Sequence, residues 1–110
     1  MNISITARHF ELSGELKNHV YTTVQKLARY FDGIIRCDIV LIETKPKGSG
    51  RSVEIALHVN GNDMVATAMS TDYFRSVDAA VQKLERQLKR YKEKRRLKDK
   101  AVVRKVRSKI

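Results

Sequence analysis

The sequence predicts an α+β fold: a four-stranded mixed sheet with two helices packed on one face, in the order β-α-β-β-β-α. Two stretches repeat apolar residues at the three- and four-residue spacing of a helix. Three shorter stretches show the alternation of half-buried strands, and a turn signal predicts a fourth strand after the last of them. At 110 residues the chain is long enough for one domain with a single modest core. We therefore expect one sheet whose second face is open to solvent.

The chain begins with a short strand and a helix. Ile3 and Ile5 alternate with polar neighbours and predict the strand. Ser13 is suited to cap the helix that follows, because its hydroxyl can accept a hydrogen bond from a free backbone amide. We expect Gly33 to end this helix in the left-handed conformation that glycine favours. The apolar face of the helix consists of Leu16, Val20, Val24, Leu27 and Phe31.

Three further strands follow this helix. Residues 35–42 alternate, and the composition of residues 45–50 then predicts a loop. Residues 53–59 show the most regular alternation in the chain. The turn signal at residues 60–63 predicts that residues 64–69 fold back as a hairpin partner. The residues expected to face the core are Ile35, Cys37, Ile39 and Leu41, then Val53, Ile55, Leu57 and Val59.

A long helix completes the predicted fold. Asp72, or Thr71 before it, can accept hydrogen bonds from the free amides of the first turn. No proline or glycine follows Asp72 to interrupt the helix. Its apolar face consists of Phe74, Val77, Val81, Leu84 and Leu88.

The end of this helix separates a domain from a tail. We predict a domain over residues 1–96 and a basic tail over residues 97–110 that is flexible in the free protein. The alternative for the tail is an amphipathic helix that forms on a partner, because Val102, Val106 and Ile110 are four residues apart.

The net charge of +11 lies entirely in the last quarter of the chain. Residues 83–110 hold fourteen lysines and arginines against three acids, whereas residues 1–82 are electrically balanced. A merely solvated surface would mix both signs. A concentrated positive field instead indicates a polyanionic partner, nucleic acid before an anionic membrane surface. We expect no membrane partner, because the tail lacks the large apolar residues of a membrane-surface helix.

The basic residues are expected to form one surface. Lys26 and Arg29 point away from the apolar face of the first helix, as the stripe on the second helix does. No run of exposed aromatic residues marks the strands, so recognition of structured RNA by its shape and backbone is favoured over a stacking platform for single strands. At about 100° per residue, the stripe lies about 150° from the core positions and consists of Lys83, Arg86, Arg90 and Lys94.

The sequence offers few residues for catalysis. Cys37 is the one cysteine, which excludes an internal disulfide and is typical of a reducing, cytoplasmic compartment. It falls on the buried face of a strand and is interpreted as a core residue rather than a nucleophile. His9, His19 and His58 lack metal-ligand spacing. We expect no enzyme, no cofactor, no metal, no signal peptide and no membrane span.

Residues 72–78, followed by residues 83–88, resemble the bacterial ribosome hibernation-promoting factor family. That family typically reads Asp-Met-Tyr-x-Ala-Ile-Asp and then Lys-Leu-x-Arg-Gln-Leu. Tyr73-Phe74 stands where the family has Met-Tyr, and we expect Phe74 still to lead the apolar face. The resemblance covers residues 1–96, and it continues at residues 2–6, 26–27, 30–32 and 57–61.

The resemblance implies a fold similar to a double-stranded-RNA-binding domain. It also implies a translation inhibitor of stationary phase or stress that occupies the messenger and transfer-RNA sites of the small ribosomal subunit. We expect a monomer in the free state, because nothing in the sequence requires the strands to pair across an edge. The implied partners are that subunit, the whole ribosome, ribosomal RNA and, where ribosomes are paired, a second small factor. By position the resemblance carries rRNA contacts to Lys26, Lys83, Arg86, Arg90, Lys92, Lys94 and Arg96; Arg29, Lys89 and Arg95 complete the candidate rRNA-binding set.

Two alternatives stay open from the residues. The first is a free-standing double-stranded-RNA binder that shares only the architecture. The second is a protein-interaction module that modulates a transcription factor through the open sheet face or the tail.

Overall fold

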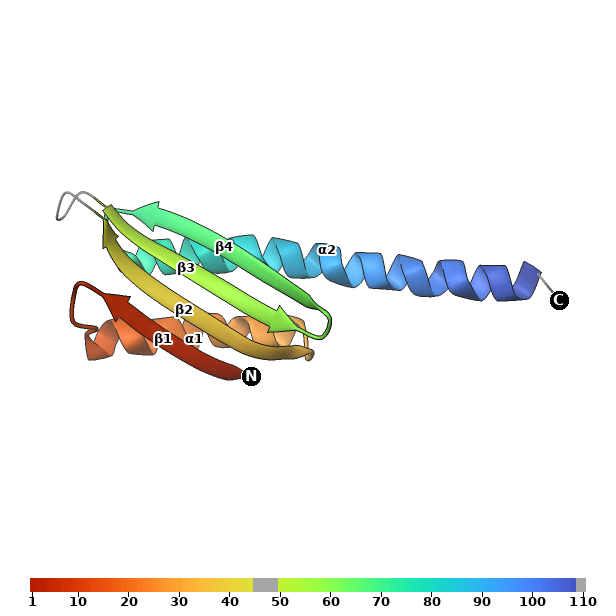
Figure 1. Cartoon of the computed structure of the whole chain (residues 1–110), viewed down its shortest axis with the longest axis horizontal. Helices are drawn as coiled ribbons and strands as arrows, with labels where there is room; N and C mark the ends of the chain where they lie inside the picture. The colour runs from red at the N-terminus through yellow and green to blue at the C-terminus, as the bar shows by residue number, and fades with distance from the viewer. Residues whose placement is uncertain (45–49, 109–110) are drawn as a thin grey trace.

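One sheet and two helices make up the fold, as predicted (Figure 1). The structure, a computed structural model, describes the backbone of residues 1–44 and 50–108 and the side chains of residues 1–43 and 50–94. The predicted loop therefore lies outside the described residues, apart from its last residue, which begins a strand. The elements are β1 (Asn2–Arg8), α1 (Gly14–Tyr30), β2 (Ile34–Thr44), β3 (Gly50–Val59), β4 (Asn62–Ser70) and α2 (Tyr73–Ser108).

The strands lie in the order β1-β2-β3-β4. β1 pairs with β2 in parallel, and the other two pairings are antiparallel. The parallel pair is joined through α1, the crossover that such a pair requires. Both helices cover one face of the sheet and run side by side, so the other face is open (Figure 1). The fold class predicted from the sequence is confirmed.

Helix α1 begins as predicted and ends differently. The Ser13 hydroxyl accepts a hydrogen bond from the Leu16 amide at 3.2 Å, which confirms the N-cap. The prediction for Gly33 is wrong, because Gly33 does not adopt a left-handed conformation. The helix ends where Phe31 turns to extended backbone, with φ −152° and ψ 121°, while its amide still bonds the Leu27 carbonyl. Gly33 instead provides space, since a Cβ there would lie 2.7 Å from Cε1 of Phe31.

Strand β2 contains an irregularity that the alternation pattern missed. Cys37 is buried as predicted, as are the next two predicted positions of the strand, but Ile35 is 59% exposed and Ile34 is buried. The pairing with β3 shifts between Ile34 and Arg36. A bulge of this kind inserts one residue and moves the preceding side chains to the other face. The expectation for Ile35 is therefore corrected: Ile34 takes the place in the core.

The hairpin between β3 and β4 is confirmed. Gly61 in its turn has a φ of +78°, which glycine adopts without strain. Met64 and Ala66 place the alternate residues of β4 against the core. The four predicted core residues of β3 are buried: Val53, Ile55, Leu57 and Val59.

Helix α2 starts at the predicted cap, but with a different aromatic residue in the core. The Asp72 carboxylate accepts a hydrogen bond from the Arg75 amide at 2.8 Å. Phe74 is 39% exposed, whereas Tyr73 is buried and its ring stacks on Phe10 with centroids 4.5 Å apart. Tyr73 precedes Val77 by one turn and therefore lies on the same side of the helix. The expectation that Phe74 leads the apolar face is wrong.

The second half of α2 projects beyond the sheet (Figure 1). The Tyr91 hydroxyl donates a hydrogen bond to the Asn60 carbonyl at the β3–β4 turn, so the sheet ends near Tyr91. The helix continues through Ser108 and gives the molecule extents of 65 × 23 × 17 Å. The domain boundary at residue 96 and the flexibility of the tail in the free protein stay predictions.

Candidate nucleic-acid interface

The candidate cations lie on two neighbouring helices. Lys26 and Arg29 occupy the last turns of α1, beside the middle of α2. Side-chain bonds join the helices, among them His19 to Asp78 at 2.8 Å and Lys92 to the Tyr30 carbonyl at 2.6 Å. The exposed members of the set are Lys26, Arg29, Lys83, Arg86, Lys89, Arg90, Lys92 and Lys94; the side chains of Arg95 and Arg96 lie outside the described part.

Two lysines mark the sides of this surface. The Lys83 ammonium donates a hydrogen bond to the Thr67 carbonyl on β4 at 2.6 Å. Lys92 makes the equivalent bond to the Tyr30 carbonyl on α1. Both acceptors are uncharged backbone carbonyls, so neither bond pairs a lysine with an acid. Because these bonds run in opposite directions from α2, the cations between them face away from the sheet.

The positive charges of this surface are not paired with acids. Within the part of the chain whose side chains are described, none of the candidate cations forms an ion pair with a carboxylate. The acids beside them are Glu85, which is half-buried, and the exposed Asp32 and Glu93. Uncompensated cations on one face produce the field that attracts a polyanion.

On the open face of the sheet, by contrast, basic and acidic side chains contact one another. His58 lies between two carboxylates, 3.2 Å from that of Asp38 and 2.9 Å from that of Asp63. Arg36 also contacts Asp38, at 3.0 Å. These side chains are hydrogen-bonded to one another within the molecule. The helical face is therefore the better candidate for phosphate binding.

Two hollows open between the helices, and Tyr30 lines both. The first has a volume of about 300 Å³, and the second about 440 Å³. Tyr30 is 47% exposed and was missed as a site residue by the sequence reasoning. Its position directly after Arg29 was the available signal. The first hollow is also lined by Gln82, Glu85, Arg86 and Lys89, and the second by Arg29, Phe31, Asp32, Gly33 and Lys92.

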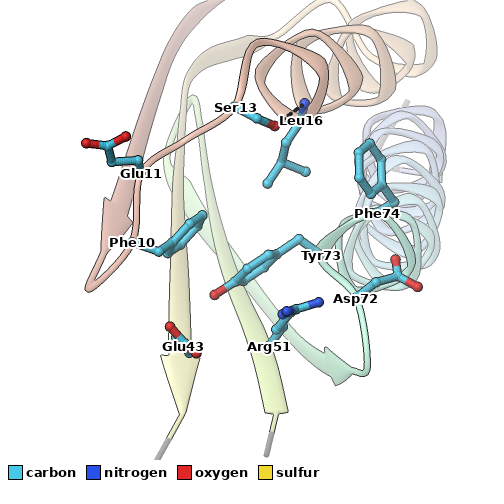
Figure 2. Close-up of a pocket in the computed structure, with 9 residues that line it drawn as sticks. All are labelled: Phe10, Glu11, Ser13, Leu16, Glu43, Arg51, Asp72, Tyr73 and Phe74. Carbon is cyan, nitrogen blue, oxygen red and sulfur yellow. Dashed lines mark hydrogen bonds between the residues drawn. The ribbon is translucent and has the colours of Figure 1, made fainter. Parts of the chain in front are cut away.

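A third hollow, of about 280 Å³, lies at the start of α2 and is lined by acids (Figure 2). Among the described residues, three acids line it, Glu11, Glu43 and Asp72, with one cation, Arg51. The Arg51 guanidinium lies 5.7 Å from the centroid of the Tyr73 ring. Three carboxylates around one hollow repel phosphate, so this hollow does not extend the basic surface.

The Tyr73 hydroxyl beside this hollow is buried and has no hydrogen-bond partner in the part of the chain that the structure describes. Burial, chiefly, and the nearby Glu43 carboxylate raise the pKa of Tyr73, and Arg51 partly opposes this. The phenol therefore stays protonated and uncharged at neutral pH.

The interpretation of Cys37 as a core residue is confirmed. Its side chain is fully buried, and burial together with the Asp38 charge raises its pKa to about 12. The thiol is therefore protonated at neutral pH and unsuited to nucleophilic attack. Among the described residues, no group of histidine, cysteine or acidic side chains is placed to hold a metal ion. No helix in this same part of the chain has the length and apolar character to cross a membrane.

Comparison with known proteins gives consistent matches. A model of the protein family described as "Sigma 54 modulation protein / S30EA ribosomal protein" matches residues 3–96. The ribosome hibernation promoting factor of Azotobacter vinelandii is 31% identical over 94 residues, which cover 86% of this chain and 85% of that protein. The N-terminal domain of Thermus thermophilus Protein Y superposes with a TM-score of 0.74 at 28% identity, covering 83% of this chain and 99% of that one. A ribosomal subunit interface protein of Coxiella burnetii gives 0.77 at 26% identity, covering 84% and 99%.

Proposed function

We propose the function of this chain from one premise: it belongs to the Sigma 54 modulation protein / S30EA ribosomal protein family. The proposed function is that of a non-catalytic ribosome hibernation factor. It binds the small ribosomal subunit through the basic surface of α1 and α2 and inhibits translation in stationary phase or stress. The observation that carries the proposal is the set of exposed cations on these helices, which have no carboxylate partner among the described side chains.

The proposed mechanism needs only binding. Exposed lysines and arginines neutralise rRNA phosphates and release condensed counterions, which gives affinity with little sequence preference. The sheet and helices supply a rigid shape, and α2 continues beyond the sheet. The bound protein then lies in the path of messenger and transfer RNA and blocks initiation sterically. Arg86, Lys89 and Arg90 are the central contacts proposed on α2.

Co-sedimentation with ribosomes tests the proposal. The purified protein is run with 70S ribosomes and isolated subunits through sucrose gradients at low and moderate salt, with excess random duplex RNA as competitor. We expect the protein to migrate with the small subunit and with whole ribosomes despite the competitor. A heavier peak that forms on addition of the protein would add ribosome pairing to the function.

The same gradients separate the two alternatives. Removal of the protein by any duplex would identify a general double-stranded-RNA binder. Protein that stays at the top of the gradient would refute ribosome binding. A protein partner captured after nuclease treatment and at high salt would favour a modulator of a transcription factor instead.

A further inference from the structure

Tyr30 is an exposed aromatic side chain in the middle of the basic surface. It is the last residue of α1, its side chain is 47% exposed, and it lines both hollows between α1 and α2. Arg86 and Lys89 line the hollow on one side with one acid, Glu85, and Arg29 and Lys92 line the hollow on the other with one acid, Asp32. Tyr30 therefore lies between two pairs of cations, with a hollow between it and each pair.

The backbone at Tyr30 is held in place from three directions. The Lys92 ammonium donates a hydrogen bond to the Tyr30 carbonyl at 2.6 Å. The next residue, Phe31, bonds the Leu27 carbonyl through its amide and packs edge-on against the Tyr91 ring, with centroids 5.5 Å apart. Gly33 leaves the room that the Phe31 ring occupies. The backbone from which the Tyr30 side chain extends is therefore held in place before any partner binds.

An aromatic ring between cations matches the chemistry of an unpaired nucleotide. The ring offers a flat face on which a base can stack, and the flanking cations can bind the phosphates before and after that base. A fully paired duplex hides its base faces and cannot use the ring. The cations of the basic surface contact only the phosphate backbone of the RNA. Tyr30 therefore adds a preference for RNA with an unpaired base, which cations alone do not give.

We propose that Tyr30 is a stacking platform for one unpaired base of the bound RNA, with Arg29 and Lys92 on one side of that base and Arg86 and Lys89 on the other. The identification of this RNA as ribosomal RNA rests on the proposed function. The stacking of a base on Tyr30 does not depend on that function.

Three variants isolate the ring of Tyr30. Tyr30→Ala removes it, Tyr30→Phe keeps the stacking face without the hydroxyl, and Tyr21→Ala is the matched control. Tyr21 lies nine residues earlier on α1, about half a turn round the helix from Tyr30. Thermal melts of all three establish that each is folded.

The first measurement uses two RNA probes, a fully paired hairpin and the same hairpin with single-adenosine bulges. We expect wild type, Tyr30→Phe and Tyr21→Ala to bind the bulged hairpin more tightly than the paired one. Tyr30→Ala should bind both hairpins equally, through phosphate contacts alone. The proposal is overturned if wild type shows no preference, or if the preference survives in Tyr30→Ala.

The second measurement uses ribosomes and keeps the proposal separate from the proposed function. We expect Tyr30→Ala to bind 70S ribosomes about tenfold more weakly than wild type, the effect of removing one base stack. Tyr30→Phe should bind like wild type. If wild type fails to bind ribosomes, the proposed function fails, and the hairpins still decide whether Tyr30 stacks on a base.

Discussion

The ammonium of Lys83 on α2 donates a hydrogen bond to the backbone carbonyl of Thr67 on β4, with nitrogen and oxygen 2.6 Å apart. One turn further along α2, the Gln87 amide donates in the same way to the Val65 carbonyl at 3.0 Å. β4 is an edge strand, and its outward carbonyls would otherwise be open to pairing with another chain. Lys83 therefore has a structural partner in addition to its proposed role in RNA binding.

Removing both donors should expose the β4 edge. We expect Lys83→Met with Gln87→Met to self-associate as its concentration rises, because the Val65 and Thr67 carbonyls become available to a second strand. Sedimentation velocity over a range of concentrations measures this. Arg86→Met with Gln87→Met is the control, since it removes one positive charge as well but keeps the bond from Lys83. Equal behaviour of the two variants would contradict this role of Lys83.

Reversing the central charges of the surface should weaken binding without unfolding the protein. Arg86→Glu with Arg90→Glu changes two exposed residues that have no carboxylate partner in the described part of the chain, so the melting temperature should stay close to wild type. Ribosome affinity should fall, and the slope of log K against log salt should decrease by about 1 for each phosphate that the variant no longer neutralises. Filter binding at several salt concentrations measures both quantities.

A control variant with the same net charge separates the effect of this surface from the general attraction between a positive protein and RNA. Arg8→Glu with Lys17→Glu gives the same net charge, but these residues lie on β1 and in the first turn of α1. We expect this variant to bind ribosomes like wild type. An equal decrease of affinity in both double variants would refute the role of Arg86 and Arg90.

Most of the fold could be predicted because its signals are local and periodic. The alternation in β3 and the N-cap residues Ser13 and Asp72 depend on neighbours along the chain, and the structure confirms them. The errors occurred where a nonlocal contact decides. Ile34 replaces Ile35 in the core because β2 bulges against β3, and such a bulge leaves no mark in the apolar pattern.

The candidate site could be predicted only in part. The sequence states which residues are charged, but it does not state which side chains become neighbours when the elements pack. The exposure of Arg86 and Arg90 follows from their distance from the apolar stripe of α2. The bonds from Lys83 to β4 and from Lys92 to α1 depend on the packing of other elements. Tyr30 acquires its place between two hollows only when α2 lies beside α1.

Removing the buried hydroxyl of Tyr73 should stabilise the protein. Tyr73→Phe keeps the stack on Phe10 and deletes a polar group that has no partner in the described part of the chain. A buried unsatisfied hydroxyl costs about 1–3 kcal/mol, so we expect the free energy of unfolding to rise by about 1 kcal/mol. Urea denaturation measures the change. Tyr30→Phe, whose ring is half exposed, is the control and should unfold like wild type; a decrease of stability in Tyr73→Phe would mean that its hydroxyl makes a favourable interaction.

The buried thiol of Cys37 should make the fold sensitive to alkali. In the unfolded chain the thiol ionises near its ordinary pKa of 9.0, whereas burial raises the pKa in the folded protein to about 12. Between these values the unfolded state has released a proton that the folded state keeps, so stability falls as pH rises. The stabilising contribution is complete below pH 9 and decreases by about 1.4 kcal/mol for each pH unit above it, until the folded thiol also ionises.

Cys37→Val isolates this contribution, because valine fills a similar volume and cannot ionise. The free energy of unfolding is measured by urea denaturation for both proteins from about pH 8 to about pH 11, where the slope applies. Tyr73, whose pKa is also raised, and every other titrating group are common to both proteins and cancel in the difference. We expect Cys37→Val to gain stability relative to wild type as pH rises. Parallel curves would mean that the folded and unfolded thiols ionise alike, and that Cys37 is more accessible to water than its complete burial indicates.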